Sequence, residues 1–369
     1  MSVKNVKGSA SVAENKALAK AGKGFPFKKI AFALLIVLIV ISFFLLVVNI
    51  VINSYFSKVT VFDGVWEIDQ NKLNSNDMYK DNVAYFSKTE ELHQAYHAAL
   101  LAYAQASSDV KYSEDVFNYA IFGTDQFAGS EMDSSADVIM LVSVDDKNDN
   151  VTYLSFEARM LVYIPAVGVG PLSDAYWLGG PQLLVNTIEL NYGIHLDGFV
   201  ELNMSAFVEL IDEYGPIEFS GDKALVEKIN NDIAEFNVAK ALSGDDAVNK
   251  VTLKNGKVTM NGQQTLAYMR NAGRAKSDIT NNVLSQITSK IYEDGFVGVK
   301  TTLDIALEKM TVSLLREDVG ALIEIGLSVF ETIEAVPVGN TGITPVSNIN
   351  VYVCDYQTER AGIVSALYE

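Results

Sequence analysis

The sequence predicts a mixed α/β fold, an αβα sandwich around a mixed β-sheet, preceded by one N-terminal transmembrane helix. Three observations support this prediction. A long apolar segment stands close to the N-terminus. After residue 115 come short runs rich in β-branched and aromatic residues, with turn signals between them. Helical patterns follow these runs, and strands succeeded by interleaved helices are typical of a sheet covered by helices.

The apolar segment covers residues 30–52, where only Ser42 and Asn49 are polar. A bilayer core of ~30 Å needs about 20 apolar helical residues, which this segment supplies. A buried globular helix would carry a polar stripe, and a cleavable signal peptide would be shorter and end in small residues. We therefore expect an uncleaved transmembrane helix over residues 29–54.

Charge predicts the orientation of this helix. The residues before it hold seven lysines and one glutamate, a net charge of +6, and such basic flanks stay on the cytoplasmic side. We therefore expect a cytoplasmic tail over 1–28, an extracytoplasmic accessory region over 55–114 and the main domain over 115–369. The formal net charge of the whole chain is −18, so the part after the tail carries −24. Such an acidic domain argues against nucleic-acid binding, which needs basic patches.

Periodicity predicts the other elements in order. Strands are expected over 116–123, 138–144, 151–156 and 350–355. Helices are expected over 90–106, 180–192, 205–213, 223–241, 262–270, 279–294, 303–315 and 319–334, with a short helix at the C-terminus. Cys354 is the single cysteine, which excludes an intramolecular disulfide and cysteine-based zinc sites.

Two aspartates flank the first two predicted strands. Asp125 follows the first strand and Asp137 opens the second, so an antiparallel hairpin would bring both to the same end of the sheet. The third strand would return to that end and deliver Arg159 there. Two carboxylates beside a cation suit a Mg²⁺ ion and a phosphate. The alternative is that both aspartates are ordinary loop and turn residues.

Arginine is scarce in this chain, with five arginines against 23 lysines, and three of the five fall near the suspected site: Arg159, Arg270 and Arg274. The planar guanidinium binds two phosphate oxygens at once, which makes these residues candidates for phosphate recognition. Solvation of an exposed surface is a competing explanation for Arg274.

Other combinations of residues lack parts of a known site. His93 and His97 stand four residues apart on a predicted helix, a spacing that can place two imidazoles on one metal. No glutamate follows His93, however, and we interpret the pair as part of a half-exposed helix face. No Gly-x-Ser-x-Gly elbow and no phosphate-binding glycine-rich loop is present, which argues against serine-, cysteine- and zinc-hydrolases.

Taken together, the segments resemble the LytR–CpsA–Psr family of bacterial cell-envelope proteins over roughly residues 115–368. The matching stretches are VFNYAIFGTD at 116–125, SADVIMLVSVD at 135–145, YLSFEARMLVYIP at 153–165, LSDAYWLGG at 172–180, LDGFVELNMSAFVELIDEYGPIEF at 196–219, MNGQQTLAYMR at 260–270 and NVYVCDY at 350–356. Their order, their spacing and their position behind a basic-inside helix carry the resemblance.

The resemblance implies an αβα fold with a long apolar pocket for a polyprenyl chain. It implies the transfer of a glycopolymer, such as a teichoic acid or capsule chain, from polyprenyl pyrophosphate onto peptidoglycan at the outer face of the cytoplasmic membrane. Mg²⁺, or Mn²⁺ in its place, would assist this phosphoryl transfer. Asp125 and Asp137 match the metal-binding aspartates of the family. Arg270 matches an arginine that contacts the pyrophosphate.

The sequence also departs from the family pattern. Glu157-Ala158-Arg159 stands where the family has Pro-Arg-Asp, and Phe127, Ala272 and Ile279 occupy positions where arginines are expected. Arg159, Arg274 and Lys276 are close enough in sequence to replace the missing cations. We therefore expect catalysis to depend on Asp137, Arg159 and Arg270, and substrate binding on Arg159, Arg270, Arg274 and Lys276.

Three functions remain open on the sequence. The first is a membrane-anchored glycopolymer phosphotransferase, which retention of both aspartates and Arg270 favours. The second is a catalytically impaired family member that acts as a lipid-binding or regulatory protein, which the missing arginines favour. The third is a scaffold of wall assembly, in which residues 60–113 would be the interaction module.

Overall fold

The computed structural model describes residues 53–54, 57–62, 64, 66–124, 135–148, 150–243, 246–270, 276–313, 336–338, 344–346 and 351–369. The chain divides into two compact units, Met1–Phe56 and Ser57–Glu369. The predicted cytoplasmic tail and transmembrane helix fall in the first unit and, except for residues 53 and 54, outside the described residues. No helix in the described part of the chain is both long and apolar enough to cross a membrane.

The main sheet of the second unit is mixed, as predicted, and has seven strands in the part that the structure describes. In spatial order they are β1 (Thr60–Val61), β11 (Met310–Val312), β7 (Gly198–Asn203), β2 (Val116–Thr124), β3 (Ala136–Asp145), β4 (Asn150–Phe156) and β12 (Val336–Val338). The central strands β2, β3 and β4 form an antiparallel meander. β7 runs parallel to β2, and β12 runs parallel to β4.

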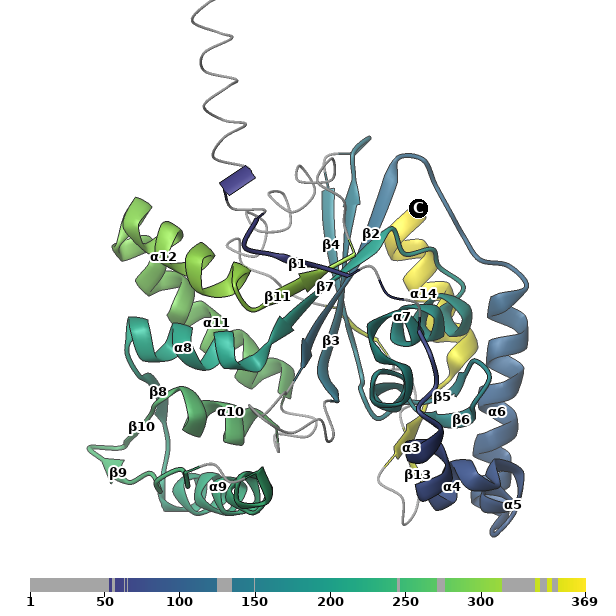
Figure 1. The fold of residues 1–369 in the computed structure, drawn as a ribbon, viewed down its shortest axis with the longest axis horizontal. Coiled ribbons are helices and arrows are strands. Elements are labelled where there is room, and N and C mark those ends of the chain that lie inside the picture. Colours follow the sequence, from purple (N-terminus) through teal and green to yellow (C-terminus); the bar gives the residue numbers. More distant parts are fainter. Residues whose placement is uncertain are drawn as a thin grey trace, which may run out of the picture. The chain divides into compact units, whose positions relative to one another are not determined.

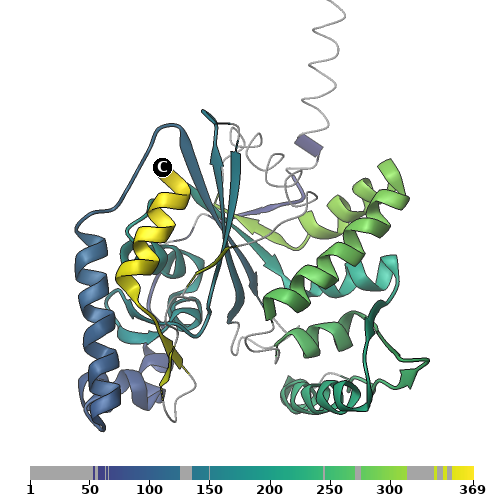
Figure 2. The ribbon, with the colours of Figure 1, turned by 180° about the vertical axis from the view of Figure 1, so that it is seen from behind.

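Helices cover both faces of this sheet, which makes the unit a three-layer αβα structure (Figures 1 and 2). One face carries α3 (Gln70–Ser75), α4 (Asp77–Lys80), α5 (Asn82–Phe86), α6 (Glu90–Ser107), α7 (Leu172–Tyr192) and α14 (Tyr356–Tyr368). The other face carries α8 (Met204–Tyr214), α9 (Lys223–Ser243), α10 (Gly262–Arg270), α11 (Lys276–Glu293) and α12 (Gly295–Leu307). The predicted α/β class is therefore confirmed.

Three smaller β-sheets accompany the main sheet in the part of the chain that the structure describes. They are β5 (Leu161–Ile164) with β6 (Gly168–Pro171), β8 (Ile217–Ser220) with β10 (Lys257–Met260) and β9 (Leu253–Lys254), and β13 (Thr344–Val346) with β14 (Val351–Val353). α7 follows the antiparallel pair of β5 and β6 directly, because Pro171 is both the last residue of β6 and the N-cap residue of α7.

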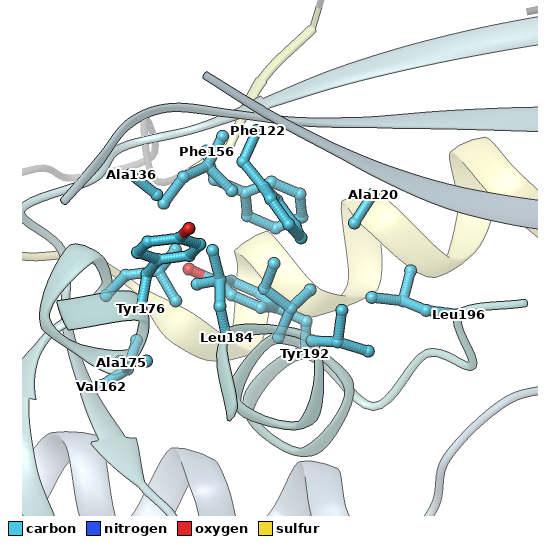
Figure 3. Close-up of a cluster of buried hydrophobic side chains, with 14 of the residues drawn as sticks. Ala120, Phe122, Ala136, Phe156, Val162, Ala175, Tyr176, Leu184, Tyr192 and Leu196 are labelled. Atoms are coloured by element: carbon cyan, nitrogen blue, oxygen red, sulfur yellow. The ribbon is translucent and has the colours of Figure 1, made fainter. Parts of the chain in front are cut away.

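The main hydrophobic core lies between the sheet and α7 (Figure 3). Alternate residues of the strands face this core, and Phe122 and Leu141 are fully buried there against Leu183 and Leu184 of α7. Burying one such side chain contributes about 1.5–3 kcal/mol. The opposite side of the sheet has a smaller cluster that includes Tyr119, and a separate core joins α8, α9, α10 and α11.

Most predicted elements are confirmed with small changes at their ends, but α7 and α12 each begin eight residues before the predicted helices 180–192 and 303–315. The predicted strands 116–123, 138–144 and 151–156 are β2, β3 and β4, and the predicted helix 90–106 is α6. The predicted helix 303–315 is wrong in its second half, because α12 ends at Leu307 and Met310–Val312 is strand β11. Pairing of β11 with β7 outweighs the local helical pattern there. The predicted helix 319–334 lies outside the described residues.

Residues of the predicted accessory region pack within the second unit. β1 pairs with β11, and Tyr79 of α4 belongs to the main hydrophobic core. Phe86 and Leu92 are buried in a further cluster with Leu161 of β5. The boundary at residue 115 stays a prediction.

Candidate functional site

The strand register brings the ends of β2 and β4 and the start of β3 to the same end of the main sheet, called the site edge from here on. Thr124, the last residue of β2, pairs with Ala136 at the start of β3, after a register shift that marks a bulge. Phe156, the last residue of β4, pairs with Ile139. The predicted hairpin is therefore confirmed. Asp125 follows β2 directly, Asp137 is the second residue of β3, and Arg159 comes three residues after β4.

Several predicted site side chains lie outside the described residues. These are the side chains of Asp125, Asp137, Arg270, Arg274 and Lys276. The backbone shows that Arg270 ends α10 and that Lys276 begins α11. Among the residues that the structure describes, no group of three potential ligands could hold a metal ion. The predicted Mg²⁺ site therefore stays a prediction, and its donor set, two carboxylates at one strand edge, fits the oxygen ligands that Mg²⁺ prefers.

Arg159 is exposed, and its positive charge acts on Asp174 in the first turn of α7. Burial raises the pKa of the Asp174 carboxyl above its ordinary value of 3.8, while the Tyr79 hydroxyl, Arg159 and Ser173 oppose that shift. The Tyr79 hydroxyl donates to Oδ2 of Asp174 at 2.6 Å. The amide of Ser173 donates to the carbonyl of Ala158 at 2.8 Å, which ties the start of α7 to the turn that carries Arg159.

A second polar cluster lies inside the same edge, and the sequence analysis missed it. Glu201 of β7 is only 8% exposed, and its Oε1 accepts hydrogen bonds from Thr124 Oγ1 at 2.9 Å and from Tyr176 Oη at 2.6 Å. Tyr176 lies among Ala136, Phe122 and Phe156 in the main core (Figure 3). The available signal was a glutamate at an inward position of a strand, since Phe199, two residues earlier, is buried in that core.

The other face of the sheet carries several apolar side chains near this edge, beside the half-buried Ser155. Ile121, Val138, Met140 and Leu202 are half-buried there, in contrast to the fully buried side chains that face α7. Side chains of this kind offer a surface that an apolar chain would cover at a gain of about 25 cal/mol per Å².

Two of the positions that lack the expected arginine are packed against cores. Ile279 is buried with Val283 in the core of α8–α11, and Ala158 packs against the main core. Phe127 and Ala272 lie outside the described residues. Any positive charge near Ile279 and Ala158 must therefore come from a neighbouring lysine or arginine.

The histidine pair lies away from this edge, on α6. His93 and His97 are both exposed, and their ring centroids are 4.4 Å apart. This agrees with the interpretation of the pair as a helix face.

Comparison with known proteins gives the family. The model of the LytR_cpsA_psr family matches residues 82–311, which is more than half of the chain. Regulatory protein MsrR of Staphylococcus aureus strain COL is 28% identical over 192 residues, 52% of this chain and 50% of MsrR. The polyisoprenyl-teichoic acid–peptidoglycan teichoic acid transferase TagT of Bacillus subtilis strain 168 is 27% identical over 216 residues, 56% of this chain and 63% of TagT.

The chain thus spans about half the length of the curated relatives that it matches. Among solved structures, the crystal structure of protein gbs0355 from Streptococcus agalactiae superposes with a TM-score of 0.52 at 18% identity, over 69% of this chain and 88% of that one. This likeness concerns the fold alone. With the family model matched over most of the main domain, the chain belongs to the LytR–CpsA–Psr family.

Proposed function

We propose that the protein is a membrane-anchored extracytoplasmic phosphotransferase that moves a glycopolymer from polyprenyl pyrophosphate onto peptidoglycan. The observation that carries the proposal is the strand register, which gathers the ends of β2 and β4 and the start of β3 at one edge. Family membership supports it, as does the curated name of TagT, a teichoic acid transferase. The half-buried apolar side chains beside the edge suit a polyprenyl chain.

In the proposed reaction a hydroxyl of peptidoglycan attacks the phosphorus next to the glycan. The bond from that phosphorus to the bridging oxygen breaks, polyprenyl phosphate leaves, and the hydroxyl proton passes to a base. A bound Mg²⁺ would supply charge neutralisation of the pyrophosphate. Asp125 and Asp137 would hold that ion. Arg159, Arg270, Arg274 and Lys276 would orient the phosphate oxygens by charge-assisted hydrogen bonds.

The burial of Ile279 favours a second candidate, a catalytically impaired member that binds the lipid-linked glycan without transferring it. Losing one donor that acts in the transition state typically costs about 10²–10³ in rate. With apolar residues at several arginine positions, turnover would depend on Arg159, Arg274 and Lys276 as replacements.

A transfer assay separates the two candidates. The full chain is incubated with Mg²⁺, a synthetic polyprenyl-pyrophosphate glycan and uncrosslinked peptidoglycan, beside the variants Asp137→Ala and Asp145→Asn. Asp145 is the last residue of β3, at the opposite end of the strand from Asp137, and serves as the control. We expect glycan on peptidoglycan with the wild type and the control, and none with Asp137→Ala.

Unchanged transfer by Asp137→Ala would refute the proposed metal site. No transfer by the wild type, in a mixture where TagT works, would refute the enzyme. Retention of the labelled lipid by the chain would then support the lipid-binding candidate.

A further inference from the structure

A pocket of about 390 Å³ lies between α6 and α14. These two helices lie side by side on the same face of the main sheet (Figures 1 and 2). Asn191, near the C-terminal end of α7, contributes to the wall of the pocket, whereas the N-terminal end of α7 lies at the site edge. The volume is at the lower end of the range for small-molecule sites, about 300–1,000 Å³. The pocket therefore has room for a small ligand.

Two cations share one carboxylate among the lining residues of this pocket. Nη2 of Arg360 donates to the carbonyl of Asp109 at 2.6 Å and to its Oδ2 at 3.1 Å. Nζ of Lys111 donates to Oδ1 of the same carboxylate at 2.9 Å. Lys111 and Arg360 lower the pKa of the Asp109 carboxyl below its ordinary value of 3.8, so it is ionised at neutral pH. The other lining residues, all in the described part of the chain, are uncharged, and the pocket carries one excess positive charge.

The guanidinium of Arg360 is held in place and keeps donors free. It lies against Gly193, where a Cβ would come within 2.7 Å of Nε and 2.9 Å of Nη2. Among the described residues, neither its buried Nε nor its Nη1 has a hydrogen-bond acceptor. Arginine carries five N–H donors, and here only those of Nη2 are engaged. A guanidinium fixed in this way can bind an oxyanion through Nη1 at little cost in conformational entropy.

Neutral groups complete the pocket. The exposed side chains of Gln105 on α6 and Gln357 on α14 bring an amide from each helix. Each amide can donate and accept, which suits a partner with hydroxyl groups. Ala102 and Ala361 also line the pocket, and these small apolar residues leave space between the helices.

We propose that this pocket binds a small organic anion, in which one oxyanion group, a carboxylate or a phosphate, is carried on a hydroxyl-bearing body the size of a sugar ring. Arg360 Nη1 and Lys111 Nζ bind the oxyanion. The amides of Gln105 and Gln357 bind the hydroxyls. The proposal is independent of the proposed function, because it uses no residue of the site edge.

The competing explanation is that Arg360 and Lys111 only tie the segment after α6 to α14. The two explanations differ in what a change of charge does. Lys111→Gln leaves the pocket neutral, so it should weaken the binding of an anion. Asp109→Asn leaves the pocket with two positive charges and keeps both acceptor oxygens for Arg360, so it should strengthen that binding. If the ion pairs only hold the fold, the wild type binds no such anion and the variants change stability alone.

The experiment measures the affinity of the full chain for glucuronate and for glucose 6-phosphate by titration calorimetry at low ionic strength. Glucose is the neutral analogue, and acetate and inorganic phosphate are the bare anions. We expect glucuronate, glucose 6-phosphate or both to bind at least about tenfold more tightly than glucose, because a charge-assisted hydrogen bond is lost with the neutral ligand. Comparison of the two sugar anions shows whether the pocket prefers a carboxylate or a phosphate.

Matched variants test the residues. Lys111→Gln should weaken the binding of the sugar anion about tenfold or more, and Asp109→Asn should strengthen it about threefold. Gln357→Ala, at an exposed position, should weaken the sugar anion and leave acetate unchanged. Lys257→Gln and Glu218→Gln make the same two changes of charge in an exposed ion pair of the separate β8–β10–β9 sheet. We expect these two controls to bind within about twofold of the wild type, because distant exposed charges are screened.

The outcomes decide between the explanations. Binding of a sugar anion that falls in Lys111→Gln and rises in Asp109→Asn supports the proposal. Equal binding of glucose or of a bare anion overturns it, as does binding that Lys111→Gln and Gln357→Ala both retain. Wild type that binds neither glucuronate nor glucose 6-phosphate also overturns it, and the ion pairs are then a tie between the helices. Circular dichroism of each variant separates loss of binding from loss of the fold, and Gln357→Ala tests the pocket if Asp109→Asn does not fold.

Discussion

At the scale of single residues, Tyr79, Asp174 and Arg159 connect the accessory region to the candidate site. Tyr79 lies on α4, and its hydroxyl donates a hydrogen bond to Asp174, which is 95 residues later in the sequence. Asp174 in turn lies within the electrostatic reach of Arg159. A change in the accessory region would therefore alter the surroundings of an arginine that we expect to bind phosphate.

Asp174 predicts a pH dependence of stability. Its pKa in the folded protein lies above the ordinary 3.8, so the folded state binds more protons than the unfolded state at pH values just above 3.8. The contribution of this group to stability is therefore most favourable below that value and falls as pH rises through the folded pKa. Asp174→Asn removes the titration and keeps an acceptor for Tyr79. We expect the unfolding free energy of the variant, relative to wild type, to increase with pH across this range in urea titrations.

Asp145→Asn is the control of opposite sign. Hydrogen bonds from Asn148 lower the pKa of the Asp145 carboxyl, so its contribution is present above the ordinary value and is lost as pH falls. Relative to wild type, this variant should lose stability as pH rises through that range. Parallel pH profiles for the wild type and Asp174→Asn would contradict the prediction.

The single cysteine, Cys354, should be a poor nucleophile. Burial raises the pKa of its thiol to about 12, and Glu359 and Asp355 add to the shift. We expect alkylation of the native protein at pH 8 to be slower than alkylation of the unfolded chain by about 10³, because only the thiolate reacts. Mass spectrometry of iodoacetamide-treated samples measures both rates. Equal rates with and without urea would show that the thiol is accessible and ionises normally.

At the scale of elements, a bend lets the single helix α7 contribute both to the site edge and to the far end of the main core. Gly179 and Gly180 have non-helical backbone angles, and φ of Gly180 is +70°. The turns before the bend carry Asp174 and Tyr176 at the site edge. The turns after it also pack on the main core and end at Tyr192, which is followed by Gly193 in the left-handed conformation.

Gly180 and Gly362 form a matched pair for testing this bend. A Cβ at either position would have no heavy atom within 4 Å, so a change to alanine acts through the backbone alone. Gly180→Ala should cost about 1–3 kcal/mol, because φ +70° with ψ −165° is a backbone conformation that essentially only glycine adopts. Gly362→Ala, inside α14 at an ordinary helical φ, should stabilise by about 0.5–1 kcal/mol. Urea unfolding measures both, and equal effects would argue against strain at the bend.

At the scale of the whole molecule, the described residues between 57 and 114 are part of the second compact unit. Their helices supply buried side chains such as Tyr79 and Phe86, and their strand β1 extends the main sheet. A chain that begins at residue 115 would expose the apolar surfaces that these elements cover.

We therefore expect a protein of residues 57–369 to unfold in one cooperative transition. A protein of residues 115–369 should show no such transition. Near-ultraviolet circular dichroism and urea unfolding test this, since loss of several buried side chains at about 2–5 kcal/mol each exceeds a typical stability margin. A chain 115–369 with the same unfolding midpoint as 57–369 would show that the earlier region contributes nothing to stability.

The sequence by itself determined the family, the α/β class and the antiparallel order of the central strands. The strands of 116–156 have clear turn signals between them, so the meander of β2, β3 and β4 followed from local pattern alone. The helices with strong periodicity, such as 90–106 and 262–270, were equally predictable.

Only the tertiary structure decided the rest, because the contacts involved join residues far apart in the chain. Met310–Val312 is a strand because β7 pairs with it, against a local helical pattern. Glu201 is buried because Thr124 and Tyr176, 77 and 25 residues away, surround its carboxylate. Burial and charge balance depend on such distant partners, and no local pattern encodes which partner a polar side chain will meet.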